Sequence, residues 1–271
     1  MSQSTEPGEG IPGNRPITIP ARHNPTLEKI VERLNADAEL HQLWRCANVN
    51  AVDRQGMSDH GEVHIRIVAN SSLRILRLLY EGGIEPSVVT NYQLTRDDAE
   101  VIVVLAAVLH DIGISAHRED HERFSVALAQ PKLKDLLEGI YDADRRVIIS
   151  SEASHAIYAH RWDVPCLTIE AGAVKVGDAT DMTKGRSRIP FEAGKVNIHS
   201  VSAAAIDNVT IKKGEVKPVG IEIAMSNSAG IYQLDELLRR KLKNSSIADY
   251  VEVVAKIEAE AERRLVTLYT F

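Results

Sequence analysis

The feature that most constrains this chain is an apolar run that ends in a histidine next to an aspartate. The run covers residues 101–109, follows Glu100 and leads directly into His110 and Asp111. Its β-branched residues are compatible with a buried strand as well as with a buried helix. Three features favour a helix: a pair resembling a capping box at Thr95 and Asp98, a length that strands seldom reach, and a glycine placed to end the segment just after Asp111.

A helix this apolar is surrounded by other elements, so it brings His110 and Asp111 into the interior of the protein. A buried ionised carboxylate needs a counter-charge there. The counter-charge is either a basic side chain or a metal ion, because divalent metals bind imidazole nitrogen and carboxylate oxygen together. Both alternatives stay open on this segment alone.

Composition excludes several classes of protein. The chain has 271 residues, 44% of them apolar, which suits one large domain or two small ones. With 32 basic and 38 acidic residues the net charge is −6, so no overall field attracts a nucleic-acid polymer or an anionic membrane. No stretch is long enough for a membrane span, and residues 1–24 lack the apolar core of a signal peptide. Cys46 and Cys166 stand far apart, which indicates free thiols and a cytoplasmic location.

The spacing of apolar residues predicts a mainly α protein: a helical bundle followed by a smaller C-terminal α+β region with antiparallel strands. Residues 1–24 are rich in Pro, Gly and polar residues, and we expect a flexible, loosely draped tail. Residues 25–195 are predicted to form the helical catalytic domain. In the C-terminal region, 196–271, the pattern predicts a β-hairpin over 209–224, an amphipathic helix over 231–242, and strands near 251–255 and at the chain end.

Histidines and acids gather in the helical part of the chain. Seven of the ten histidines lie between positions 60 and 160. A lone histidine on an apolar face is more often a hydrogen-bonded core residue than a ligand, and His60, at a helix start, is expected to reach solvent. A combination of two imidazoles and two carboxylates from three buried helices reverses that preference, because helical bundles build metal sites in this way. The combination consists of His64, His110, Asp111 and Asp178.

The order and flanks of these four residues resemble a known family. His64 stands in His-Ile-Arg-Ile-Val, His110 and Asp111 in His-Asp-Ile-Gly, and Asp178 in Val-Gly-Asp-Ala-Thr-Asp. This pattern is similar to the HD-domain superfamily of metal-dependent phosphohydrolases, over about residues 59–185. The C-terminal part is similar to an uncharacterised archaeal and bacterial subgroup. The resemblance implies a helical core in which the four residues hold a divalent cation.

Members of this superfamily with two metals use additional histidines between the His-Asp pair and the last aspartate. His121 and His160 are the best matches for those positions, and His155 and His117 are the rivals. A second ion would be bridged to the first by Asp111, but the gap between Asp111 and His121 is shorter than in several two-metal members, so one or two ions remain open. Mixed imidazole and carboxylate ligands suit Mn, Fe, Co, Ni or Zn better than Ca and do not choose among them.

The chemistry implied by the resemblance assigns roles to the neighbouring charges. Hydrolysis of a phosphate ester needs a hydroxide near neutral pH and positive charge on the phosphoryl oxygens, and a divalent ion supplies both. His110 and Asp111 are the expected catalytic pair, and basic side chains would neutralise the phosphate. The basic candidates are Lys184 and Arg186, also expected to take part in catalysis, together with Arg188 and Arg66 for substrate binding.

Each basic candidate has an alternative role. The segment 184–188 is equally compatible with a solvated basic loop. Arg66 is also placed to pair with Asp181, which we expect to orient either this arginine or a ligand histidine. Glu122, next to His121, is a further candidate for proton transfer.

Three functions are compatible with these residues. The leading one is a metal-dependent phosphomonoesterase or phosphodiesterase that cleaves a phosphate ester of a small molecule, with a nucleotide as the expected class. The alternatives are a di-iron oxygenase of the same superfamily and a non-catalytic, metal-stabilised nucleotide-binding regulator. A small phosphorylated substrate is the expected partner, and the C-terminal region is a candidate surface for a homodimer.

Overall fold

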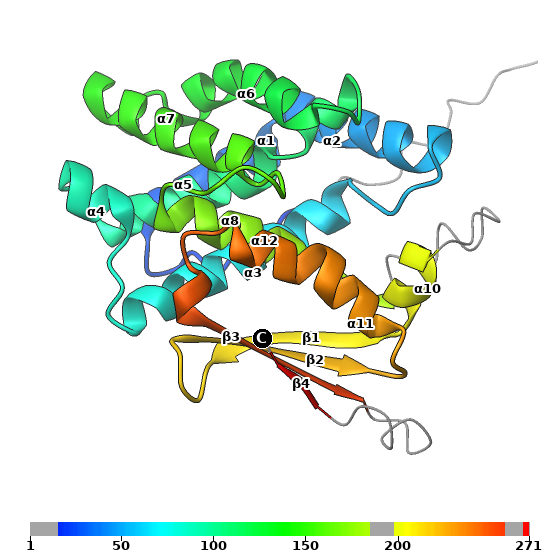
Figure 1. Cartoon of the computed structure of the whole chain (residues 1–271). Helices are drawn as coiled ribbons and strands as arrows, with labels where there is room; N and C mark the ends of the chain where they lie inside the picture. The colour runs from blue at the N-terminus through cyan, green and yellow to red at the C-terminus, as the bar shows by residue number, and fades with distance from the viewer. Residues whose placement is uncertain (1–15, 185–197, 258–267, 271) are drawn as a thin grey trace, which may run out of the picture.

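The computed structural model describes residues 16–184, 198–257 and 268–270, and its first part is helical (Figure 1). A π-helical turn, η1 (Val49–Arg54), follows the second helix, and a 3₁₀ turn, η2 (Ile112–Ser115), follows the fifth. The helices of this part are α1 (Pro25–Ala36), α2 (Ala38–Asn48), α3 (Glu62–Glu81), α4 (Ser87–Tyr92), α5 (Arg96–Leu109), α6 (His121–Leu137), α7 (Ala143–Ala159) and α8 (Ile169–Ala179).

Helix α5 contains the apolar run that leads into His110 and Asp111. All of its residues from Asp98 to Leu109 are buried, as expected for a helix surrounded by other helices. The capping box is formed, because the Thr95 hydroxyl accepts from the backbone N–H of Asp98 while the Asp98 carboxylate accepts from that of Thr95. The helix ends at Leu109, so His110 and Asp111 lie in the turn that follows it and not within the helix.

Two glycines allow the helices around α5 to approach closely. A Cβ on Gly113 would lie 2.1 Å from the carbonyl oxygen of His121, so this glycine lets the turn after α5 contact the start of α6. A Cβ on Gly177 would lie 2.2 Å from the hydroxyl of Ser72, so α8 crosses α3 at this point. A side chain at either position would push apart elements that carry candidate site residues.

The C-terminal region is the predicted α+β unit. Its elements are α10 (Ile198–Ala204), β1 (Ile206–Lys213), β2 (Val219–Met225), α11 (Gly230–Gln233), the π-helical η3 (Leu234–Arg239), α12 (Arg240–Lys243), the 3₁₀ turn η4 (Ala248–Tyr250), β3 (Val251–Ile257) and β4 (Leu268–Thr270). The strands form one sheet in the order β1-β2-β3-β4. The fold class is therefore confirmed, and β1 and β2 form the predicted hairpin, with Val209 opposite Ile223.

Antiparallel pairing was expected throughout the sheet, and it occurs between β1 and β2 and between β3 and β4. The central pair, β2 and β3, is parallel. The reason is the connection: α11, η3 and α12 run on from one another between these two strands, and a helical crossover returns the chain in its original direction.

The sheet and the helical part share one continuous core. Figure 1 shows the sheet below the long helices, with the α11–η3–α12 helix lying across it. Val219, Ile221 and Ile223 of β2 are buried in the same cluster as Ile75 and Leu79 of α3. The division into 25–195 and 196–271 remains a prediction, and a boundary there would cross this core.

The N-terminal segment is better ordered than predicted where the structure describes it. Ile17 is only 2% exposed and its backbone N–H donates to the side chain of Asn35, 2.7 Å away. Asn24 is buried and caps α1 by accepting from the backbone N–H of Leu27. Residues 16–24 are therefore packed, which corrects the expectation of a loose tail over this part; residues 1–15 lie outside the described residues.

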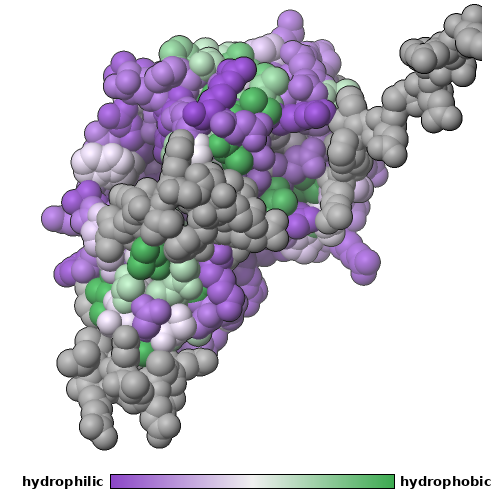
Figure 2. All heavy atoms as spheres, turned by 90° about the vertical axis from the view of Figure 1, so that its right-hand side faces the viewer, coloured by the Kyte–Doolittle hydropathy of each residue, from purple (hydrophilic) through white to green (hydrophobic). Residues whose placement is uncertain are grey.

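One face of the described surface is mostly polar (Figure 2). Figure 2 shows one face on which hydrophilic side chains cover most of the helical part and hydrophobic side chains appear as smaller patches between them. Among the described residues, no helix combines the length and apolar character needed to cross a membrane.

Candidate metal centre

Four side chains meet at the end of α5 and form the first ligand group. They come from α3 (His64), the turn after α5 (His110 and Asp111) and α8 (Asp178). The Nε2 atom of His64 lies 3.3 Å from Nε2 of His110, 3.3 Å from Oδ2 of Asp111 and 3.4 Å from Oδ1 of Asp178. Nε2 of His110 lies 3.2 Å from Oδ2 of Asp111 and 3.8 Å from Oδ1 of Asp178. His64 and His110 therefore each face both carboxylates, and His64, His110 and Asp178 form a group that could hold a metal ion.

A second ligand group forms around the other oxygen of Asp111. Oδ1 of Asp111 lies 3.0 Å from Nε2 of His121 and 3.7 Å from Nε2 of His160. These two ring nitrogens are 3.2 Å apart. His121 is the first residue of α6 and His160 follows the last residue of α7, so the two groups draw on five segments of the helical part.

The spacing of these atoms fits divalent metal ions. Two ligand atoms at about 2.1 Å from a common ion lie roughly 3.0 to 3.4 Å apart in octahedral or tetrahedral geometry. Most of the distances above fall in or close to that range, and the donors are the imidazoles and carboxylates that transition metals prefer. His64, His110, Asp111 and Asp178 would hold one ion, and Asp111, His121 and His160 would hold a second.

Hydrogen bonds at the far side of the rings prepare three of the histidines as ligands. A ring nitrogen that faces an oxygen acceptor carries the proton, which leaves the other nitrogen free to bind a metal. In each case the Nδ1 atom faces the acceptor and Nε2 faces the centre. The acceptors are Oδ2 of Asp181 for His64 at 2.6 Å, the carbonyl of Ala107 for His110 at 2.7 Å and the carbonyl of Ile157 for His160 at 2.5 Å.

His121 is the exception in this pattern. Its Nδ1 atom lies 3.0 Å from the carbonyl oxygen of Arg118 and 2.6 Å from the guanidinium Nη1 of the same residue. The ring cannot donate to the carbonyl and accept from the guanidinium at once. A metal held at Nε2 would favour the first arrangement, in which Nδ1 donates to the carbonyl of Arg118.

Electrostatics keep both acids of the centre in the ligand form. Burial on its own raises the pKa of Asp111, but attraction to His110 and hydrogen bonds with His110, His121 and His60 outweigh it and lower the pKa well below its usual range. Burial likewise opposes ionisation of Asp178, whose pKa is nevertheless lowered well below its usual range by a set of nearby basic groups. These groups are, in decreasing order of effect, Lys241, His110, His64 and His160.

His160 is also held in the ligand form. Its burial lowers the pKa of the ring well below its usual range, and electrostatic interactions with His110, His121 and Lys241 lower it further. Neutral imidazole is the form that binds a metal. Asp111, Asp178 and His160 are therefore ready to coordinate without first changing protonation.

Comparison with known proteins assigns the chain to a family. It is 44% identical over 231 residues to the uncharacterised protein MJ1020 of Methanocaldococcus jannaschii, an alignment covering 85% of this chain and 89% of that protein. The family model of the HD domain matches residues 63–183, which include both ligand groups. The chain belongs to the HD-domain family. The suspected resemblance is thereby confirmed, and with it membership of a superfamily of metal-dependent phosphohydrolases. No solved structure matches the chain.

His60 joins the HD centre although the sequence placed it toward solvent. It is only 9% exposed, and its Nδ1 atom lies 2.8 Å from Oδ2 of Asp111. It precedes α3, and its backbone N–H donates to the side chain of Asn48, which fixes the turn. The separation of four residues from His64 is the one sequence signal that pointed to it.

Lys241 reaches the HD centre from the C-terminal region. It lies on α12, and its ammonium group forms an ion pair with Oδ2 of Asp178. Nothing in the sequence singled out Lys241, because it stands in a cationic last turn that already suits the helix dipole. Only the packing of α12 against α8 brings it to the metal ligands.

Two rival histidines lie apart from the HD centre. His155, predicted among the metal ligands, accepts instead from the backbone N–H of Leu167 at 3.0 Å, and burial lowers the pKa of its ring. It is on α7 but five residues before His160, and it belongs to neither ligand group. His117 is exposed and accepts from the backbone N–H of Glu119.

The charged candidates are distributed differently from the prediction. Lys184 is exposed and pairs with Asp207 at 2.9 Å, outside the ligand groups, while Arg186 and Arg188 lie outside the described residues. Arg66 is half-buried, and the Asp181 carboxylate faces His64 instead of this arginine.

The candidate for proton transfer, Glu122, lies beside the second ligand group. It is buried, and its Oε2 atom lies 3.4 Å from Nδ1 of His121.

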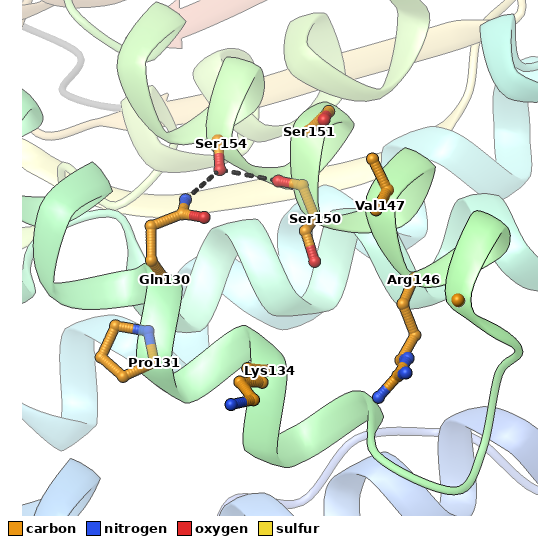
Figure 3. A pocket seen from close by; sticks show the side chains of 9 residues that line it. Gln130, Pro131, Lys134, Arg146, Val147, Ser150, Ser151 and Ser154 are labelled. Atoms are coloured by element: carbon orange, nitrogen blue, oxygen red, sulfur yellow. Dashed lines mark hydrogen bonds between the residues drawn. The ribbon is translucent and has the colours of Figure 1, made fainter.

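A separate pocket lies between α6 and α7 (Figure 3). Gln130 donates to the hydroxyl of Ser154, which in turn donates to the carbonyl of Ser150, so the two helices are joined across it. Lys134 and Arg146 add positive charge to its lining. The pocket contains none of the clustered histidines and aspartates and is distinct from the HD centre.

Proposed function

We propose that the protein is a metal-dependent hydrolase that cleaves a phosphate ester of a small molecule, with nucleotides as the first substrate class. The observation that carries this proposal is the orientation of Asp111, whose two oxygens face two different ligand groups. A divalent ion such as Mn, Fe, Co, Ni or Zn, bound at one or both groups, would supply hydroxide near neutral pH and positive charge for phosphoryl oxygens.

The surrounding residues support this chemistry. Asp181 and two backbone carbonyls fix the rings of His64, His110 and His160, so that the ligand atoms are ordered before a metal binds. The buried walls of the centre exclude bulk water, which strengthens electrostatic interactions with a charged substrate. Nucleotides are favoured as a class by the family resemblance.

A cation beside the second ligand group is suited to a phosphate. The guanidinium of Arg118 lies against the His121 ring, and its buried Nε atom has no hydrogen-bond partner among the described residues. Among the residues that the structure describes, no carboxylate forms an ion pair with the Arg118 guanidinium. Guanidinium groups bind phosphate through paired N–H donors, so Arg118 takes the role first expected of Lys184 and Arg186.

The test is hydrolysis of a nucleotide panel by protein loaded with Mn, Co or Ni, with metal content measured in each sample. Asp111→Asn should lower kcat/KM by roughly 1000-fold or more, because loss of a ligand shared by both groups removes several kcal/mol of transition-state stabilisation. The matched control is Asp97→Asn, an exposed acid at the other end of α5, which should retain activity. Activity that persists in Asp111→Asn would refute the proposal.

One observation also supports the oxygenase alternative. Five histidines, including His60, surround Asp111, and a histidine-rich set suits iron. If the protein is an oxygenase, protein purified without oxygen and then loaded with Fe should consume dioxygen in the presence of a candidate substrate. Phosphate release without dioxygen uptake supports the hydrolase. Tight nucleotide binding without either reaction would instead support a regulator.

The remaining expectations are part of the same proposal. The substrate is a small molecule and not a nucleic-acid polymer, in line with the net charge of −6. A cytoplasmic location is supported by two free cysteines, one exposed and one buried. A homodimer through the C-terminal region is tested by light scattering of the full chain.

A further inference from the structure

The C-terminal region contributes one side chain to the HD centre. Lys241 is 8% exposed and its ammonium group donates to Oδ2 of Asp178. The other oxygen, Oδ1, faces His64 and His110 at 3.4 and 3.8 Å. The ammonium group is therefore separated from the first ligand group by a single carboxylate.

Lys241 also lies within electrostatic reach of the second ligand group. Its positive charge contributes to the lowered pKa of His160 as well as to that of Asp178. His160 and Asp178 belong to different groups, which meet at Asp111. The ring of His110 connects them: its Nε2 lies 3.8 Å from Oδ1 of Asp178, and its centroid lies 4.8 Å from that of the His160 ring. A ligand that contacts both groups would therefore lie close to Asp178 and to the ammonium group paired with it.

The hydrogen bonding of Lys241 is incomplete in comparison with the other buried lysines. Lys132 donates to both oxygens of Asp37 and to Glu39, and Lys175 donates to the carbonyls of Val164 and Asn244. An ammonium group has three N–H donors. For Lys241, one acceptor is found among the described residues, the carboxylate of Asp178.

Unused donors of a buried cation are costly, and an anionic ligand removes that cost. A phosphoryl group offers several oxygens with negative charge and would satisfy these donors beside the metal ligands. The ion pair with Asp178 holds the ammonium group in place, so that little side-chain entropy is lost on binding.

We propose that Lys241 binds a phosphoryl oxygen of the substrate, so that the C-terminal region is part of the active site. This inference rests on the proposed phosphohydrolase function. It assigns a role to α12 and to its packing against α8. The competing role is purely positional, in which Lys241 only holds Asp178 for the metal.

The experiment compares Lys241→Met and Lys241→Arg with the control Lys243→Met, an exposed lysine on the same helix. Equilibrium dialysis measures Mn affinity, and calorimetry measures the binding of inorganic phosphate to the Mn-loaded full chain.

In Lys241→Met, Mn affinity should stay within about 3-fold of the wild-type value. Phosphate affinity should fall about 10-fold or more, which is the loss expected for a charge-assisted hydrogen bond. KM should rise more than kcat falls. Lys241→Arg should retain part of the affinity, and Lys243→Met all of it.

Two results would overturn the inference. One is unchanged phosphate affinity in Lys241→Met, and the other is a loss of Mn affinity large enough to account for the loss of phosphate binding. Thermal unfolding checks that the variant is folded, and Lys241→Gln carries the same test if the methionine variant is not. If the wild-type protein binds Mn but neither binds phosphate nor hydrolyses any ester, the proposed function fails instead.

Discussion

Helix α5 has a buried acid near each end, and the surroundings of the two acids differ. Glu100, near the start, is 1% exposed and accepts hydrogen bonds from Arg77 at 2.7 and 3.0 Å and from Tyr80 at 2.9 Å. Asn24 donates to it as well, at 3.2 Å. Asp111, after the end, is surrounded by histidine rings, three of which present an unprotonated nitrogen to the centre.

The cluster around Glu100 is therefore a stabilising cluster, and the cluster around Asp111 is a ligand-binding cluster. The charge of Glu100 is balanced by a permanent cation, and its oxygens are saturated with donors, so nothing further is needed there. The carboxylate of Asp111 is instead surrounded by histidine rings, whose nitrogens can donate electron pairs to a metal. A cluster rich in electron-pair donors becomes electrostatically complete when a metal cation binds.

The largest effect expected at the stabilising cluster is that of Glu100→Gln. Burial on its own raises the pKa of Glu100, but hydrogen bonds from Arg77, Asn24, His23 and Tyr80 outweigh it and lower the pKa to about 2, from 4.5. A difference of that size corresponds to about 3 kcal/mol of folding stability at pH 7. Glu100→Gln should therefore lower the free energy of unfolding in urea by about 3 kcal/mol, without changing Mn affinity.

The dependence of this effect on pH follows from the direction of the shift. A carboxyl whose pKa is lowered in the folded state stabilises the protein above its unfolded pKa and loses that contribution as the pH falls toward the folded value. The difference between wild type and Glu100→Gln should be complete at pH 7 and shrink between about pH 5 and pH 2. A difference that does not depend on pH would contradict the electrostatic explanation.

The sequence predicted the parts of the metal centre that local spacing determines. His64 and Asp178 stand on helices whose burial follows from apolar periodicity, His110 and Asp111 directly follow the apolar helix α5, and the structure brings these four together. The cluster around Glu100, near the start of α5, could not be predicted in this way, because Asn24 and Arg77 lie far from Glu100 in the chain.

His60 and Lys241 were missed for a related reason. His60 precedes its helix, so helical periodicity says nothing about its direction, and a hydrogen bond to Asn48 turns it inward. Lys241 looks like an ordinary surface cation until the crossover between β2 and β3 places α12 on α8. The parallel pairing of those strands depends on the same crossover, which the alternation of apolar residues does not reveal.

The next effect is the rise in Tm on addition of Mn, which distinguishes the cluster around Asp111 from the cluster around Glu100. A metal that binds only the folded state stabilises it by about 2.7 kcal/mol when its free concentration is 100 times the Kd. Mn should raise the Tm of the wild type and of Glu100→Gln by similar amounts, because the Glu100 cluster does not bind it. In Asp111→Asn the rise in Tm should be largely lost. Equal shifts in all three proteins would mean that the ion binds elsewhere.

The smallest effect concerns the support of a single ligand. The Asp181 carboxylate accepts from Nδ1 of His64 at 2.6 Å, so it orients the ring and increases the basicity of Nε2. In Asp181→Asn the amide oxygen still accepts this bond but the charge is lost, and Mn affinity should fall by about 10-fold, at the lower end of the 10- to 100-fold usual for such partners. Equilibrium dialysis measures it, with Asp97→Asn as the control. Because the contact of Asp181 with His64 supports a metal ligand, the metal-free Asp181→Asn protein should lose far less stability than Glu100→Gln does. A loss as large as that of Glu100→Gln would show that the two ends of α5 are both structural clusters.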